Sequence, residues 1–260
     1  MKGGGIGRRL SRLRPAVYDR SGSAGSAMTN LIAAAAVFLA IHLFISGTTL
    51  RDAIVGAIGE KPYMGAFSLL SLVVIVWLAI AFNHAGAMPG SAADPYLYDL
   101  GTGARHAAPL VVAIAFLIGV PGLLTPNPTS VNREGLAGKE GVVRGVLRIT
   151  RHPFLWGVAL WAADHLATNG DLAGVIFFGS FLLLALFGTV SIDAKRKRKL
   201  GPAWEAFAAQ TSNVPFAAIL SGRNQFRAGE YFDWRFGVAV LLFVVLLFAH
   251  VHIFGVSSFA

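Results

Sequence analysis

Residues 31–50 read LIAAAAVFLAIHLFISGTTL, twenty consecutive residues without Asp, Glu, Lys or Arg. About 20 apolar residues in a helix are enough to cross the hydrocarbon core of a membrane. Five more apolar stretches follow along the chain, one of them short. The six stretches are Leu31–Leu50, Met64–Asn83, His106–Leu124, Pro153–Ala167, Leu172–Ile192 and Phe236–Phe254. The sequence therefore predicts an all-α fold, a polytopic membrane helix bundle with about six transmembrane helices.

The composition supports this prediction and excludes several classes of protein. Of the 260 residues, 55% are hydrophobic and 13% are charged, whereas soluble domains contain about 25% charged residues. Such a low fraction of charged residues excludes a disordered tail, a nucleic-acid-binding module and a typical cytosolic enzyme. The chain has no cysteine, which excludes disulfides, thiolate metal sites and a cysteine nucleophile. The net charge is +9. Because the cations lie between apolar stretches, we expect membrane lipid head groups, and no nucleic acid, as their partners.

The distribution of lysine and arginine among the loops predicts the orientation of the bundle. The loops 51–63, 126–151 and 193–235 are rich in these cations, whereas the loops 84–105 and 168–171 are poor in them. Cation-rich loops stay in the cytoplasm. We therefore expect the three rich loops to be cytoplasmic and both chain ends to lie on the opposite side of the membrane.

Residues 1–27 form a basic extension that differs from the rest of the chain. It contains six cations and a single acidic residue, Asp19, a composition typical of a targeting peptide or a solvated tail. Its charge conflicts with the predicted orientation, and translation from Met28 would remove the conflict. We expect one membrane domain, residues 28–260.

The short stretch Pro153–Ala167 is too polar to face lipid on all sides. It contains Trp161, Asp164 and His165. Ionisable side chains in the hydrocarbon core are costly and usually face the interior of a bundle. We therefore expect this helix to be internal, with Trp161 and Asp164 facing the first two membrane spans.

Histidines within membrane spans are candidate functional residues, because ionisable groups are rare there. His42 lies near the middle of the first span, and Ser46, one turn further on, is placed to bond its ring. The alternative for His42 is a buried hydrogen bond between helices. His165 directly follows Asp164, and a neighbouring carboxylate often orients a metal-bound histidine.

Arg151 and His152 precede Pro153, a residue that favours the first position of a helix. Cationic side chains beside a helix N-terminus form a site for an anion. The alternative for His152 is simple capping of the helix at the membrane interface. We expect both residues on the same side of the membrane as the basic run Lys195–Lys199, which is typical of an anchor to lipid head groups.

The order of these residues resembles that of the NnrU family of bacterial membrane proteins over about residues 29–222. The segments that carry the resemblance are His42–Ser46, Leu50–Arg51, Ile58–Leu72, Thr150–Pro153, Leu160–Leu166, Asn169–Leu172 and Phe178–Gly179. The resemblance implies a bacterial inner-membrane protein that is linked to nitrite and nitric oxide metabolism.

The same pattern resembles plant 15-cis-ζ-carotene isomerases, which use a haem b held by membrane histidines to isomerise a polyene double bond. This resemblance implies that His42 and His165 bind the haem iron. It also implies that His84, Arg151 and His152 belong to the cofactor-binding residues. A carotenoid or another polyene lipid is then the expected partner.

Two features limit what the resemblance implies. The isomerases have a cysteine where this chain has Ala162, so any chemistry that requires this thiol is lost. A rise of 1.5 Å per residue places His42 and His165 at depths that differ by roughly 10 Å. One iron can therefore bind both histidines only if their helices converge.

A second, weaker resemblance is to membrane methyltransferases that bind S-adenosylmethionine. It rests on Arg151–Pro153, Gly157, Leu200–Phe207 and Pro215–Phe216. Those enzymes have a pair of carboxylates before the Leu-Gly, where this chain has only Asp193. The resemblance implies S-adenosylmethionine as an alternative cofactor, bound at an altered site.

Three functions therefore stay open from the sequence. The first is a haem b membrane protein that acts as a double-bond isomerase on a polyene lipid. The second is a non-enzymatic accessory protein of nitrite or nitric oxide metabolism. The third is an S-adenosylmethionine-dependent membrane methyltransferase.

Overall fold

The computed structural model describes residues 20–45 and 49–259. Within these residues the chain is mostly helical and has no β-strand beyond an isolated bridge between Tyr96 and Asp171. The long helices are α1 (Arg20–Ala40), continued by the π-helical turn η1 (Ile41–Ile45), α3 (Glu60–Ala85), α4 (Gly101–Leu124), α6 (Pro153–Thr168), α7 (Leu172–Leu200) and α11 (Trp234–Phe254). The short elements are α2 (Thr49–Ile58), η2 (Glu134–Leu136), α5 (Val146–Ile149), α8 (Pro202–Gln210), α9 (Ala217–Leu220) and α10 (Ala228–Tyr231).

Among the described residues, five helices are long and apolar enough to cross a membrane: α1 with η1, α3, α4, α7 and α11. The remaining predicted span is α6, which has 16 residues and is shorter than the roughly 20 residues needed to cross the hydrocarbon core. The prediction of a polytopic all-α membrane bundle is confirmed. The short fourth apolar stretch forms α6, an internal helix flanked by longer ones.

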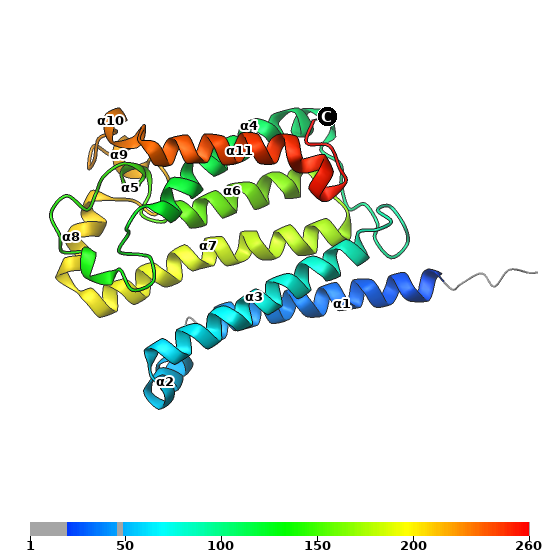
Figure 1. Ribbon diagram of the computed structural model, residues 1–260, viewed down its shortest axis with the longest axis horizontal. Coiled ribbons are helices and arrows are strands. Elements are labelled where there is room, and N and C mark those ends of the chain that lie inside the picture. Colours follow the sequence, from blue (N-terminus) through cyan, green and yellow to red (C-terminus); the bar gives the residue numbers. More distant parts are fainter. Residues whose placement is uncertain (1–19, 46–48, 260) are drawn as a thin grey trace, which may run out of the picture.

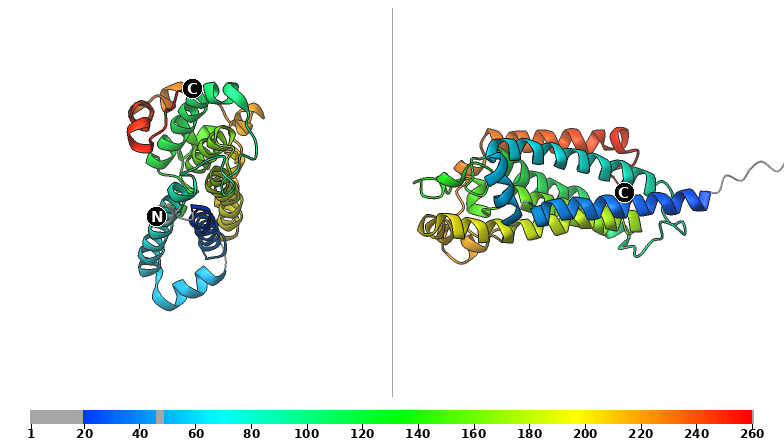
Figure 2. Two further views of the ribbon diagram at one scale, coloured as in Figure 1. Left: turned by 90° about the vertical axis from the view of Figure 1, so that its right-hand side faces the viewer. Right: turned by 90° about the horizontal axis from the view of Figure 1, so that it is seen from below.

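The long helices run side by side (Figures 1 and 2). α6 packs between α4 and α7, and α11 packs on α4. α1 pairs with α3, and this pair contacts α7. The apolar core of the pair includes Leu31, Phe38 and Leu78.

The internal helix α6 does not face the first two spans, so this expectation was wrong. Trp161 packs edge-on against Phe178 and Phe181 of α7, at centroid distances of 5.4 and 5.6 Å. The reason is that α7 contacts both α6 and the α1–α3 pair and separates them. Asp164 is only 7% exposed, so it is buried in the protein as expected.

Small residues set the distance between α4 and α6. A Cβ atom added to Gly157 would lie 2.5 Å from the Cα of Gly119 and 2.8 Å from the carbonyl oxygen of Ala115. Membrane helices approach closely where such small residues face each other, and the gain is van der Waals contact. Gly157 therefore lets α6 press against α4 along much of its length.

The three cation-rich loops lie at one end of the bundle, together with α2, α5, α8, α9 and α10 (Figure 1). We call this the basic end. α1 begins and α11 ends at the opposite end. As the sequence predicted, successive loops lie at alternate ends of the bundle. The cytoplasmic location of the basic end stays a prediction.

The boundaries of the first span differ from the prediction. α1 begins at Arg20, so the last residues of the predicted extension are helical, and residues 1–19 lie outside the described chain. Met28 is buried in the core between α1 and α3. The described part of the span ends at Ile45, residues 46–48 lie outside the described chain, and Leu50 belongs to the separate helix α2. Residues 46–49 are polar but carry no charge, so a boundary drawn at the next charged residue included them in the span.

Replacing Gly157 with alanine should lower the free energy of unfolding by about 1–3 kcal/mol, because the added methyl group forces α4 and α6 apart. The matched control is Gly179→Ala on α7, where an added Cβ atom would meet no atom within 4 Å. This control should keep or gain stability, since alanine favours the helix. Thermal unfolding of the purified variants in detergent measures both effects. Equal free energies of unfolding for Gly157→Ala and Gly179→Ala would contradict the close contact between α4 and α6.

Candidate functional site

His42 lies in the π-helical turn η1, close to the end of the described span Ala24–Ile45 and not near its middle, where the sequence predicted it. Its Nδ1 atom is 2.7 Å from the carbonyl oxygen of Phe38. Its ring centroid lies 4.8 Å from that of Phe38 and 5.6 Å from that of Phe67 on α3. An Nδ1–H that donates to a backbone carbonyl leaves Nε2 as the unprotonated nitrogen, the one that binds a metal. The expected partner Ser46 lies outside the described residues.

His165 repeats this arrangement in the last turn of α6. Its Nδ1 atom is 2.9 Å from the carbonyl oxygen of Trp161. Its ring lies 5.0 Å from the ring of Trp161 and 4.7 Å from that of Phe178. The Oδ2 atom of Asp164 is 3.8 Å from the same Nδ1 atom. Both histidines are therefore fixed by a carbonyl group four residues earlier and lie against aromatic rings.

A chain of aromatic rings connects the two histidines. The centroid distances are 4.8 Å from His42 to Phe38, 5.0 Å from Phe38 to Phe181, 5.6 Å from Phe181 to Trp161 and 5.0 Å from Trp161 to His165. In the described part of the chain no direct ring contact joins the two histidines. The structure thus links them through three rings but does not bring them against each other.

The donor set suits a haem iron better than a bare metal ion. In the described residues, no group of three or more His, Asp or Glu side chains is placed to hold a metal. A bare ion such as zinc usually takes three or four protein ligands. A haem iron takes four nitrogens from the porphyrin and needs only one or two axial ligands from the protein. Single histidines with an unprotonated Nε2 atom, set among aromatic rings, fit this second requirement.

A third histidine interacts electrostatically with His165, and no pattern in the sequence predicted this. His250 of α11 is within electrostatic range of His165. Its Nδ1 atom is 2.9 Å from the carbonyl oxygen of Val256, in the tail that follows α11. Because His165 and His250 are 85 residues apart in the sequence, only the fold reveals that they are neighbours.

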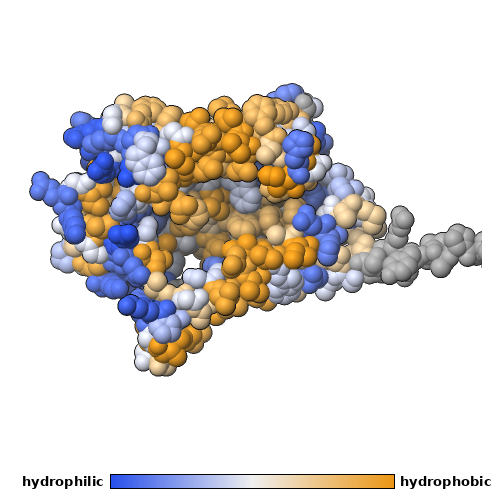
Figure 3. Space-filling model, in the orientation of Figure 1, coloured by the Kyte–Doolittle hydropathy of each residue, from blue (hydrophilic) through white to orange (hydrophobic). Residues whose placement is uncertain are grey.

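One face of the bundle is hollowed between two apolar ridges (Figure 3). The ridges follow α11 and α3 in the orientation of Figure 1, and hydrophobic atoms line much of the hollow. α6 and α7 are set back from these two helices (Figure 2). The hollow is open on the face that Figure 3 shows.

Arg151 and His152 form an ion-pair network at the basic end. The Nε atom of Arg151 is 2.9 and 3.0 Å from the two carboxylate oxygens of Asp193, and a second guanidinium nitrogen also bonds this carboxylate. His152 Nε2 is 2.6 Å from Oδ1 of Asp193. The anion predicted beside the N-terminus of α6 is thus the protein's own Asp193, on α7. Arg151, His152 and Lys195–Lys199 lie at the same end, as expected.

His152 is completely buried in this network. Burial lowers the pKa of His152, although the hydrogen bond to Asp193 opposes the effect. The neutral ring donates its Nε2–H to Asp193, and its Nδ1 atom has no hydrogen-bond partner. Asn213, which follows α8, also contacts Asp193 at 3.4 Å. The network therefore ties α6, α7 and the segment after α8 together.

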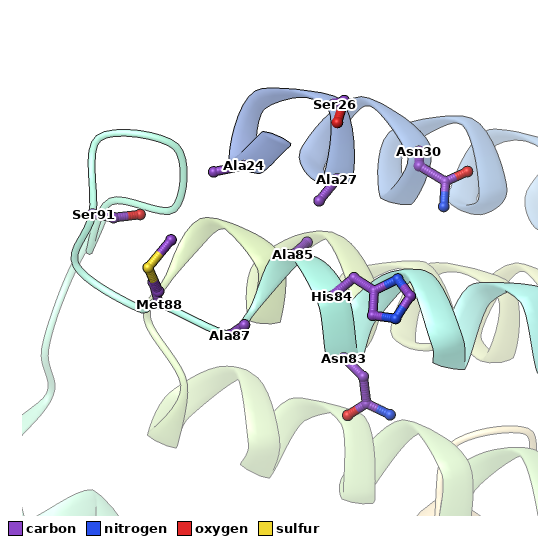
Figure 4. A pocket seen from close by; sticks show the side chains of 10 residues that line it. All are labelled: Ala24, Ser26, Ala27, Asn30, Asn83, His84, Ala85, Ala87, Met88 and Ser91. Carbon is purple, nitrogen blue, oxygen red and sulfur yellow. The ribbon is translucent and has the colours of Figure 1, made fainter. Parts of the chain in front are cut away.

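His84 lies apart from the other predicted site residues. It lines a pocket of about 540 Å³ at the end opposite the basic end, together with Asn30 and Asn83 (Figure 4). The five predicted residues thus occupy three places. His42 and His165 share the aromatic chain, Arg151 and His152 share the basic end, and His84 faces its own pocket.

The aromatic partners of the two core histidines were not predicted from the sequence. Phe38 and Trp161 each precede a histidine by four residues, which is one helical turn. This spacing is a signal that the sequence contained. Phe178 and Phe181 come from another helix, and no local pattern assigns them to a histidine.

Replacing Asp193 with alanine should lower the free energy of unfolding by about 3–5 kcal/mol, because it leaves the buried charge of Arg151 unpaired. Unfolding of the purified variants in detergent, by heat or by a denaturant other than guanidinium, measures the loss of stability. Asp52→Ala is the control, since Asp52 forms an exposed ion pair with Arg51, and it should change stability little. Equal stabilities of the two variants would show that the network contributes nothing to the fold.

Comparison with known proteins identifies the family. Residues 30–258 match the family described as NnrU protein. A protein named 15-cis-zeta-carotene isomerase, chloroplastic, from Arabidopsis thaliana is 29% identical over 212 residues, which is 80% of this chain and 54% of that protein. Its namesake from Zea mays is 31% identical over 109 residues, 41% of this chain and 30% of that protein. The chain thus spans about half or less of the length of these relatives, and no solved structure matches it. Because the family match extends over most of the sequence, the chain belongs to the NnrU family.

Proposed function

We propose that this protein binds haem b through His42 and His165 and isomerises a double bond of a polyene lipid. One observation carries the proposal. Each of these membrane histidines donates Nδ1–H to a carbonyl group one turn earlier and lies against aromatic rings. This arrangement fixes the ring and gives Nε2 the lone pair that an axial ligand requires.

The surroundings of the histidines match the needs of a bound porphyrin. Haem, when bound, supplies an iron centre whose reactivity depends on its axial ligands and on the polarity around it. Trp161, Phe178 and Phe181 provide flat apolar surfaces next to His165. Because α7 lies between α6 and the α1–α3 pair, a single iron shared by both histidines requires α1 and α6 to approach each other, in addition to repacking of Phe38 and Phe181.

The proposed substrate follows from the hollow and from the relatives. A long polyene is apolar and dissolves in the membrane, and the hollow is lined by hydrophobic atoms. The two curated relatives are named for 15-cis-zeta-carotene. A 15-cis polyene of this kind is therefore the substrate class that we propose for this chain. We place the protein in the bacterial inner membrane, with the basic end in the cytoplasm.

Three other predicted residues have supporting roles in this proposal. Arg151 and His152 hold the basic end together through Asp193. His84 lies at the opposite end, where a polar group of a bound molecule can reach it. The methyltransferase alternative has less support, because Arg151, His152 and Asp193 bond one another.

Replacing His42 or His165 with alanine should abolish the low-spin, bis-histidine absorption spectrum of the haem-loaded protein, because the iron loses an axial ligand. His252→Ala is the matched control on α11 and should leave the spectrum unchanged. Absorption and electron paramagnetic resonance spectra of the purified variants measure the effect. His250→Ala should also retain the spectrum. If the spectrum is lost in this variant, the second axial ligand is His250 of α11 and not His42. A full haem complement with an unchanged spectrum in the His42→Ala, His165→Ala double variant would refute the ligand assignment.

A further inference from the structure

A pocket lies at the end of the bundle opposite the basic end, away from His42 and His165 (Figure 4). Its walls come from the first half of α1, the last turn of α3 and the loop that follows α3. Its volume of about 540 Å³ is typical of a site for a small molecule. The first span begins at Ala24 and the span on α3 ends at Ala85, and both residues line the pocket. The pocket therefore lies where these two membrane spans reach their ends.

Three polar side chains of the two spans line this pocket and are exposed. Asn30 lies six residues inside the first span, which is about 9 Å along a helix. Asn83 and His84 lie in the last turn of α3, and within the described residues neither forms a hydrogen bond. Polar side chains within a membrane span are costly unless a partner satisfies them. These residues therefore require a polar partner from outside the fold.

The groups that the pocket offers to such a partner are mainly hydrogen-bond donors. Oδ1 of Asn30 accepts the Nε1–H of Trp77 at 3.1 Å, so its amide nitrogen is left to donate. Oγ of Ser91 accepts the backbone N–H of Asp94 at 3.2 Å, which leaves its O–H to donate. A neutral imidazole, as in His84, has one N–H donor. Figure 4 shows the Asn30 side chain pointing from α1 toward α3, which carries His84. The matching ligand is one with acceptor oxygens.

The remaining wall of the pocket defines the rest of the ligand. The residues that line it include no Asp, Glu, Lys or Arg, so an anionic head group finds no lysine or arginine to pair with, in contrast to the basic end. Ala27, Ala85 and Met88 supply apolar surface beside the donors. An uncharged molecule with acceptor oxygens on an apolar body fits both properties.

We propose that this pocket binds the carbonyl head of an uncharged membrane lipid, with Asn30, His84 and Ser91 donating hydrogen bonds to its oxygens. Two kinds of lipid carry this chemistry, a quinone with two ring carbonyls and a diacylglycerol with two ester carbonyls. A hydrocarbon polyene has no oxygen to accept these hydrogen bonds. The pocket is therefore a second ligand site, separate from the proposed isomerase function and independent of haem.

The test is the binding of two probes to the full-length protein in detergent, measured by isothermal titration calorimetry. One probe is a benzoquinone with a decyl side chain, and the other is dioctanoylglycerol. Asn30→Leu and His84→Ala each remove one donor and should weaken binding about fivefold, as expected for one hydrogen bond. Thr29→Val on α1 and His106→Ala on α4 are the matched controls. Both side chains bond carbonyl groups of their own helices, and both variants should keep the affinity.

The outcomes distinguish the two lipids and separate this inference from the haem proposal. Binding of one probe alone identifies the lipid class, and binding of both, weakened by the donor variants, supports a general carbonyl site. Ala87→Phe fills the pocket from an exposed loop residue without removing a donor. It should also weaken binding, and it decides the test if the donor variants fail to fold. The proposal is overturned if neither probe binds, or if Ala87→Phe and the donor variants bind as tightly as the controls. Because the measurement requires no haem, either proposal can fail while the other stands.

Discussion

The enclosure of α6 by α4 and α7 is the constraint on which the rest of the structure depends. With 16 residues α6 is too short to cross the membrane alone, and it carries Asp164 and His165. Close contact at Gly119 and Gly157 presses it against α4, and aromatic contacts join it to α7. Burial on both sides lets polar groups stand at membrane depth without facing lipid. The candidate site exists because of this enclosure.

The charged groups of the protein fall into two classes with different roles. At the basic end, Asp193 neutralises Arg151 and accepts a hydrogen bond from the neutral ring of His152, and Arg148 is paired with Glu230. These pairs join segments that are distant in the sequence. The cations that an external anion would need are therefore already paired within the protein. In the core, the carboxyl group of Asp164 lies 3.8 Å from Nδ1 of His165, and within the described residues no donor bonds it.

Much of the fold was predictable from the sequence, because apolar stretches of about 20 residues specify membrane helices by length alone. The same reasoning identified α6 as internal from its polar residues. It failed for the neighbours of α6, since periodicity within one helix does not say which helix packs on it. It also missed the Arg151–Asp193 pair, which joins residues 42 positions apart. His42 and His165 stood out as candidates because ionisable residues are rare in apolar spans, whereas their aromatic partners came from the fold.

The central claim is that the core of this NnrU-family protein acts on a polyene. The most direct measurement is chromatographic analysis of 15-cis-ζ-carotene after incubation with the purified, haem-loaded protein in lipid vesicles. The account predicts conversion of the 15-cis isomer by the unmodified protein and no conversion by the His165→Ala variant. Haem-loaded protein that leaves the 15-cis isomer unchanged would contradict the account and favour a non-enzymatic role.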